Sequence, residues 1–270
     1  MNRTAALFGL PIAVVDVETT GLELDARIVE VAVVHMDIGG HPELVLTERV
    51  DPEVPIPEGA ARVHGITDED VADAPTWDAV APRVLRSLEG RLPCAYNAPA
   101  DYRWLRAECE RVGLELAPAW PWLDAYVPAR VVDRYESGKR LQQVASRRGI
   151  EVDAHGAAGD AFTTALLLGR LLDEAHIGQA WPLGGYLDWQ RENALREEAS
   201  FVTWMVNARR TAGDRPSCAW HELEGVTPPP WPERKAQGRC PQCRGPAVHR
   251  VSQAGHLALE DPDGGPHVCA

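Results

Sequence analysis

Two acidic side chains stand one residue apart near the start of the chain, at Asp16 and Glu18. They end an apolar run over residues 11–18 that predicts a buried β-strand. Side chains two positions apart on a strand leave the same face, so both carboxylates are expected to point together. Two adjacent acids repel each other, and a bound cation is a common reason to tolerate that. Such oxygen ligands suit Mg²⁺ or Mn²⁺, although a solvent-exposed strand end also carries acids.

Two further acids open predicted helices. Asp101 lies in the first turn of a helix predicted from Pro99, where the helix dipole alone favours a carboxylate. Asp160 opens a helix predicted over residues 158–175, and His155 precedes it by five positions. That offset does not share one helix face, so His155 is assigned to the preceding loop. A loop histidine near such an acid can be a general base beside a metal, or an ordinary surface residue.

The order and context of these groups match a known family. The three segments are Asp16-Val-Glu18-Thr-Thr-Gly, Tyr96-Asn-Ala-Pro-Ala-Asp101 and His155-Gly-Ala-Ala-Gly-Asp160. With them the chain resembles the DEDDh group of DnaQ-like 3′→5′ exonucleases, which includes the proofreading subunit of bacterial replicative polymerases, RNase T and oligoribonuclease. The resemblance runs from about residue 11 to 175 and includes residues 63–68, 123–124 and 141–150. Ala100 departs from it, because the family commonly has a phenylalanine there; the change loosens packing but removes no ligand.

The resemblance implies a metal-dependent hydrolysis of the last phosphodiester that releases a nucleoside 5′-monophosphate. In the family, Asp16, Glu18, Asp101 and Asp160 would hold two Mg²⁺ or Mn²⁺ ions about 3.5–4 Å apart, which activate water and stabilise the leaving 3′ oxygen. His155 would take the proton of that water, a role that contributes roughly 10²–10⁴-fold in rate. The terminal nucleotide is expected to contact Thr19, Gly21, Leu22, His64 and Asn97.

The elements that must position these groups are strands first, with helices interleaved afterwards. This pattern predicts an α/β sandwich with a mixed sheet, and the resemblance makes it RNase H-like. The strands are expected at residues 11–18, 27–36, 43–50, 91–96 and 122–124. The helices are expected near residues 59–63, at 76–89, from 99, and at 126–136, 139–148, 158–175 and 186–210.

The last quarter of the chain has a different character. We expect an exonuclease domain at residues 1–178, a linker and helix at 179–213, and a Cys/His-rich module at 214–270. Cys218-Ala-Trp-His221 and Cys240-Pro-Gln-Cys243 form two knuckles whose spacing fits a structural Zn²⁺ site of the zinc-ribbon kind. A metal could supply folding energy that this small segment lacks. A tail with reduced cysteines is the alternative, and other ligands compete for the fourth position: His249, His256, His267 and Cys269.

The net charge of −13 limits how the protein can bind nucleic acid. Residues 1–175 hold 17 Lys and Arg against 29 Asp and Glu, a net charge of −12. This excess argues against tight duplex binding and favours transient capture of a strand end. One basic stretch could follow a nucleic-acid backbone or simply be solvated; it consists of Arg130, Arg134, Lys139, Arg140, Arg147 and Arg148.

The sequence therefore predicts a 3′→5′ exonuclease on single-stranded 3′ ends, with DNA slightly favoured over short RNA. A polymerase or a repair protein is a candidate partner. A non-catalytic adaptor that binds a partner through its C-terminal module is the alternative from another class, and the intact acids and histidine argue against it. No apolar run approaches the roughly 18 residues that span a membrane, and a cytoplasmic protein is expected.

Overall fold

The computed structural model of the 270-residue chain describes two compact units, Met1–Gln190 and Arg191–Ala270. The described residues of the first are 9–23, 25–37, 41–116, 122–151, 156–175 and 183–190. In the second they are 191–207, 235–239, 246–251 and 257–260. No helix within these ranges is long and apolar enough to span a membrane.

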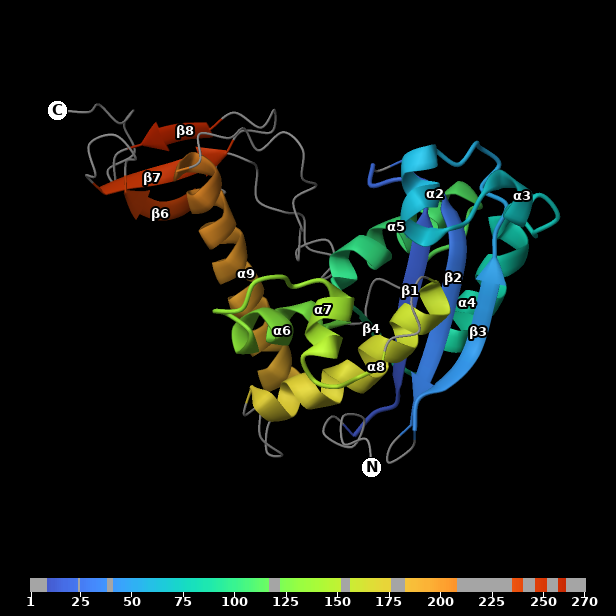
Figure 1. The fold of residues 1–270 in the computed structure, drawn as a ribbon, viewed down its shortest axis with the longest axis horizontal. Coiled ribbons are helices and arrows are strands. Elements are labelled where there is room, and N and C mark those ends of the chain that lie inside the picture. The colour runs from blue at the N-terminus through green and yellow to red at the C-terminus, as the bar shows by residue number, and fades with distance from the viewer. Residues whose placement is uncertain are drawn as a thin grey trace. The chain divides into compact units, whose positions relative to one another are not determined.

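The first unit is built on a five-stranded mixed sheet in the order β3-β2-β1-β4-β5 (Figure 1). Strands β1 (Ile12–Thr19), β2 (Ile28–Met36) and β3 (Glu43–Arg49) form an antiparallel meander. β4 (Leu92–Ala95) and β5 (Leu123–Asp124) add to β1 in parallel. The order of elements in the sequence, strands first and helices interleaved afterwards, predicted a mixed sheet, and this prediction is confirmed. The sequence analysis did not predict the order of the strands.

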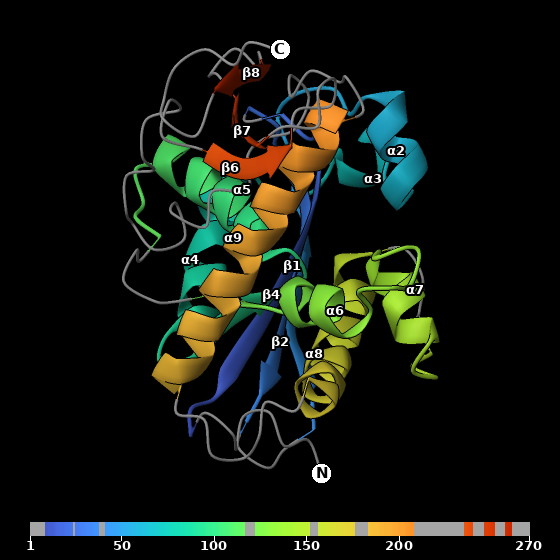
Figure 2. The same cartoon turned by 90° about the vertical axis from the view of Figure 1, so that its left-hand side faces the viewer.

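Helices cover both faces of this sheet, as the view along it shows (Figure 2). On one face lie α6 (Tyr126–Val132), α7 (Leu141–Ser146) and α8 (Ala157–Glu174). On the other lie α4 (Trp77–Leu88) and α5 (Ala98–Arg111). The short helices α2 (Glu58–His64) and α3 (Asp68–Val71) follow β3 in the chain. Each face thus buries one set of alternating strand side chains.

The packing of α8 on the sheet determines which strand residues can meet it. Ile12 and Val14 of β1 belong to one buried cluster with the apolar stripe of α8, including Ala161 and Leu168. Asp16 and Glu18 continue the same alternation along β1. They therefore face the first turn of α8 rather than α4 and α5.

The long helix α9 (Leu183–Asn207) starts earlier than the expected residue 186. Its first two turns belong to the first unit, because Tyr186 and Gln190 are fully buried. The Gln190 side chain accepts the N–H of Asp124 at 2.8 Å and donates to the carbonyl of Trp122 at 2.9 Å. These bonds give β5, an edge strand, a side-chain partner on its open side.

The second unit contains a three-stranded antiparallel sheet that the sequence analysis did not predict. It consists of β6 (Lys235–Arg239), β7 (Pro246–Val251) and β8 (Leu257–Glu260) in that order. The expected zinc ligands lie outside the described residues: Cys218, His221, Cys240 and Cys243. Zinc binding therefore stays a prediction.

Candidate active site

Three carboxylates meet where β1 faces the start of α8. Asp16, Glu18 and Asp160 each offer an oxygen, and these atoms all lie within 4.8 Å of one another. All three side chains are partly buried. The strand alternation places the first two, and the first turn of α8, which begins after Gly156, places the third. The joint position of these acids, expected from the sequence, is seen here.

Asp101, in the first turn of α5, is not part of that three-oxygen group. β1 pairs with β4 only from Ile12 to Val14 and then continues past it. The carboxylate of Asp101, which is 5% exposed, accepts the N–H of Val17 at 3.3 Å beyond that point. Asp101 thus satisfies a backbone donor that β4 leaves unpaired, and it fixes the strand between Asp16 and Glu18.

Burial and mutual repulsion disfavour the ionised form of these acids. Burial raises the pKa of Asp16 well above its ordinary value, and the charges of Asp101, Asp160 and Glu18 add to the shift. Burial and then the charge of Asp160 raise the pKa of Glu18 to about 7. Burial also raises the pKa of Asp101, although its hydrogen bond from Val17 opposes the shift. Carboxylate oxygens that converge and repel one another fit a divalent cation, because its charge would offset the repulsion.

Gln142 contacts this cluster, and the sequence analysis missed it. Its side-chain nitrogen on α7 lies 3.2 and 3.1 Å from the two carboxylate oxygens of Asp160. The amide donates without carrying charge, so it restrains the acid without neutralising it. A glutamine in a helical segment, here followed by a second one at Gln143, gives no sequence signal for this role.

Glu30 on β2 is a second residue that sequence reasoning did not find. It lies opposite Glu18 in the antiparallel register and is 7% exposed. One oxygen accepts the N–H of Ala157 at 2.7 Å, and the other pairs with Arg49 at 3.0 Å. The carboxylate thereby binds the amide end of α8, where the helix dipole favours a negative charge. This contact holds the start of the helix that carries Asp160.

The expected nucleotide contacts lie at the end of β1 and around it. The hydroxyl of Thr19 donates to the carbonyl of Gly21 at 2.7 Å, which shapes the turn after the strand. Leu22 in that turn is 72% exposed. A bulge between Glu18 and Thr19 breaks the pairing with β2. Such bulges re-aim side chains next to active sites.

His64 and Asn97 occupy two different environments. His64 is buried at the end of α2, and its Nδ1 accepts the N–H of Ile66 at 3.0 Å. Burial lowers its pKa, so the ring is neutral near pH 7 with its proton on Nε2. Asn97 is in the left-handed region, with φ 71°, and its N–H donates to Asp124 at 2.9 Å. Asp124 also accepts the N–H of Tyr126 at 2.8 Å, which ties the turn before α5 to β5.

His155, the expected general base, lies outside the described residues. The adjacent Gly156 is described, and a Cβ added there would lie 3.3 Å from Glu30. Glycine at this position therefore allows the close approach of Glu30 to the start of α8. The role of His155 stays a prediction.

The fold and the acidic cluster define a nuclease of the RNase H-like class, and comparison with known proteins narrows the class. The exonuclease family model RNase_T matches residues 13–168. This chain belongs to that exonuclease family.

Relatives with assigned names share this domain rather than the whole chain. A DNA polymerase III subunit epsilon-like protein of Rhodobacter capsulatus is 35% identical over 169 residues, which cover 60% of this chain and 24% of the relative. DNA polymerase III subunit epsilon of Rickettsia conorii is 30% identical over 167 residues, 56% of this chain and 69% of the relative. Among solved structures, exonuclease X in complex with 5′-overhanging duplex DNA is 26% identical. It matches with a TM-score of 0.50, over 66% of this chain and 99% of that chain.

Proposed function

We propose that this protein removes nucleotides from single-stranded 3′ ends, preferably of DNA, as a metal-dependent 3′→5′ exonuclease that releases nucleoside 5′-monophosphates. The observation that carries the proposal is the group of Asp16, Glu18 and Asp160, whose oxygens from two elements lie within 4.8 Å of one another. Membership of the exonuclease family supports the reaction type. The similar structure of exonuclease X, a complex with overhanging duplex DNA, supports DNA over RNA.

The acids of this chain would hold two Mg²⁺ or Mn²⁺ ions, with Asp101 as the fourth ligand. When bound, such ions supply an activated water and charge stabilisation at the leaving oxygen. Asp101 would keep β1 in place through Val17, so that the Asp16 and Glu18 carboxylates stay oriented. His155 would accept the proton of the attacking water from the loop before α8. Leu22 and Thr19 would support the terminal nucleotide at the end of β1, with His64, Gly21 and Asn97 around it.

The position of relatives in DNA polymerase III favours a polymerase as a partner of this protein. The Rickettsia relative is by its name a subunit of that polymerase. We propose that any such contact uses the part of this chain after residue 178, outside the exonuclease domain. A zinc-stabilised module in the second unit would then contribute to binding this partner.

The test is digestion of 5′-labelled single-stranded DNA and RNA of matched sequence, with Mg²⁺, with Mn²⁺ or with EDTA. A ladder that shortens from the 3′ end, requires metal and is absent in Asp16→Asn supports the proposal. Asp73→Asn is the matched control, because Asp73 is exposed and remote in the chain from the acidic cluster. Faster loss of RNA than DNA would reverse the substrate preference. Full activity of Asp16→Asn would refute the metal site.

A further inference from the structure

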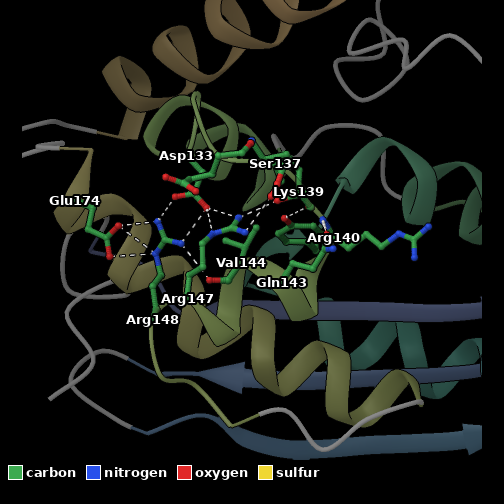
Figure 3. A network of polar contacts seen from close by, with 12 residues as sticks. Asp133, Ser137, Lys139, Arg140, Gln143, Val144, Arg147, Arg148 and Glu174 are labelled. Atoms are coloured by element: carbon green, nitrogen blue, oxygen red, sulfur yellow. Dashed lines mark hydrogen bonds and ion pairs between the residues drawn. The ribbon is translucent and has the colours of Figure 1, made fainter.

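The loop over residues 133–140, which joins α6 to α7, is anchored by ion pairs (Figure 3). Asp133 accepts hydrogen bonds from Arg147 at 3.0 and 2.6 Å and from Arg148 at 2.9 and 3.2 Å. Arg148, whose side chain is 6% exposed, also pairs with Glu174 on α8 at 2.6 Å. The start of the loop is therefore bound to the helix that carries Asp160.

The middle of the same loop is held through its backbone. Arg147 donates to the carbonyls of Ser137 at 3.3 Å and Gly138 at 2.8 Å (Figure 3). Gly138 has a φ of +74°, which places the turn in the left-handed region that glycine adopts without strain. These backbone and side-chain bonds restrict the conformations that the exposed loop can adopt.

The far end of the loop reaches the acidic cluster. The Tyr96 hydroxyl donates to the carbonyl of Lys139, and Tyr96 precedes the helix that carries Asp101. Gln142, two positions after Arg140, contacts Asp160 at 3.1 Å. Residues 139–142 thus contact Tyr96, just before α5, and Asp160 in the first turn of α8.

The loop over residues 133–140 also presents an aromatic ring and cationic side chains to solvent. Tyr135 is 90% exposed, and the Arg134 guanidinium lies 5.2 Å from the centre of its ring. Arg140 is exposed and points away from the network (Figure 3). By contrast, Arg147 and Arg148 both form ion pairs with Asp133. Among the described residues, Arg134, Lys139 and Arg140 form no ion pair with an acid.

We propose that residues 133–140 are a preformed platform for the single-stranded part of the substrate, on the 5′ side of the nucleotide that is removed. One base stacks on Tyr135, and Arg134 and Arg140 bind phosphates. Aromatic rings beside cations bind single strands with little dependence on sequence. The ion pairs that fix the loop lower the entropy cost of binding. The inference rests on the proposed function, because that function makes a single strand the ligand. Its test measures binding and does not require hydrolysis.

The test measures binding of 5′-fluorescein single strands by anisotropy, in full-length protein that carries Asp16→Asn so that the strand stays intact. Strands of about 3 and about 15 nucleotides are compared, as DNA and as RNA, because known single-strand sites span about 4–16 nucleotides and the shorter strand falls below that range. The platform variants are Arg134→Ala/Arg140→Ala, Tyr135→Ala and Tyr135→Phe. The matched control is Arg86→Ala/Arg170→Ala, which removes two exposed arginines from α4 and α8.

We expect Arg134→Ala/Arg140→Ala to bind the long strand about tenfold more weakly. The slope of log affinity against log salt should become shallower by about 1.4, which is about 0.7 for each of two lost phosphate contacts. Tyr135→Ala should weaken binding of the long strand by about tenfold, whereas Tyr135→Phe, which keeps the ring, stays within about twofold. The advantage of the long strand over the short one should shrink in both alanine variants. The control should match the parent protein.

Equal affinities and salt slopes in the platform and control variants would overturn the platform. So would a parent protein that binds no strand, or a Tyr135→Phe variant as weak as Tyr135→Ala. Failure of the proposed function is seen separately, as wild-type protein that hydrolyses neither DNA nor RNA with Mg²⁺ or Mn²⁺. Equal effects on DNA and RNA fit the platform, because stacking and phosphate contacts do not involve the sugar 2′ position.

Discussion

Replacing Glu18 with glutamine should make the metal-free protein more stable, although we propose that it also abolishes hydrolysis. The reason is electrostatic. Burial, and then the charges of Asp160 and Glu30, raise the pKa of Glu18 from its ordinary value of 4.5 to about 7. The folded state therefore disfavours the ionised carboxylate, and glutamine keeps the shape without the charge.

The size of the effect follows from the shift and depends on pH. A group whose folded pKa is raised binds its proton more tightly in the folded state, so stability is lost as pH rises from the unfolded pKa to the folded one. At 1.36 kcal/mol per pKa unit, the ionised Glu18 costs up to about 3 kcal/mol at pH 8 and under about 1 kcal/mol at pH 5. For a domain of this size, about 3 kcal/mol corresponds to roughly 6–12 °C in Tm.

The assay is thermal unfolding in EDTA from pH 5 to pH 8, followed by circular dichroism or calorimetry. Glu18→Gln should unfold at a higher temperature than wild type at pH 8, and the gap should close toward pH 5. Glu89→Gln, at an exposed position, is the control and should leave Tm unchanged. A Glu18→Gln protein no more stable than wild type at pH 8, or a gain that grows as pH falls, would refute the reasoning. Adding Mn²⁺ should then stabilise wild type more than the variant.

Three further predictions concern other parts of the chain. Gln142→Ala should raise the Kd for Mn²⁺, measured by calorimetry, by about 10–100-fold with little change in Tm, because Asp160 loses its restraint; an unchanged Kd argues against this role. Asp133→Asn should destabilise the protein by about 2–3 kcal/mol at pH 7, since Arg147 and buried Arg148 each lose a carboxylate partner and Arg148 keeps only Glu174. Burial opposes ionisation of Asp133, but Arg148 and Arg147 outweigh it and lower its pKa. The stability from these ion pairs is therefore present above the ordinary pKa of 3.8 and is lost as the pH falls below it. The difference in stability between Asp133→Asn and wild type should close in acid unfolding. Elemental analysis should find one Zn²⁺ per chain that is lost in Cys240→Ser/Cys243→Ser, and a metal-free wild-type protein would contradict the zinc module.

The sequence could predict the parts of the site that depend on local periodicity. Asp16 and Glu18 share a strand face because alternation is a property of any strand. The first-turn positions of Asp101 and Asp160 follow from where their helices begin. Such features need no knowledge of which element packs against which.

Residues that act across the fold left no such signal. Glu30 is 127 positions from Ala157, and its contact exists only because α8 packs on β2. Gln142 reaches Asp160 because α7 is held beside α8. Arg147 and Arg148 looked like part of a basic surface in the sequence, but the structure assigns them to Asp133 and Glu174. Charge counting cannot separate paired from unpaired arginines.

The hydrogen bonds seen around the acids fit the proposed cation site. The Gln142 amide donates to Asp160 and the Val17 N–H donates to Asp101, and both of these donors are neutral. The nearby guanidinium of Arg49 pairs with Glu30, which also binds the start of α8. Neutral donors orient carboxylates but leave their charge in place. An arginine at position 142 would satisfy Asp160 equally well as a hydrogen-bond donor, but it would also cancel the charge that, in our proposal, attracts a divalent ion.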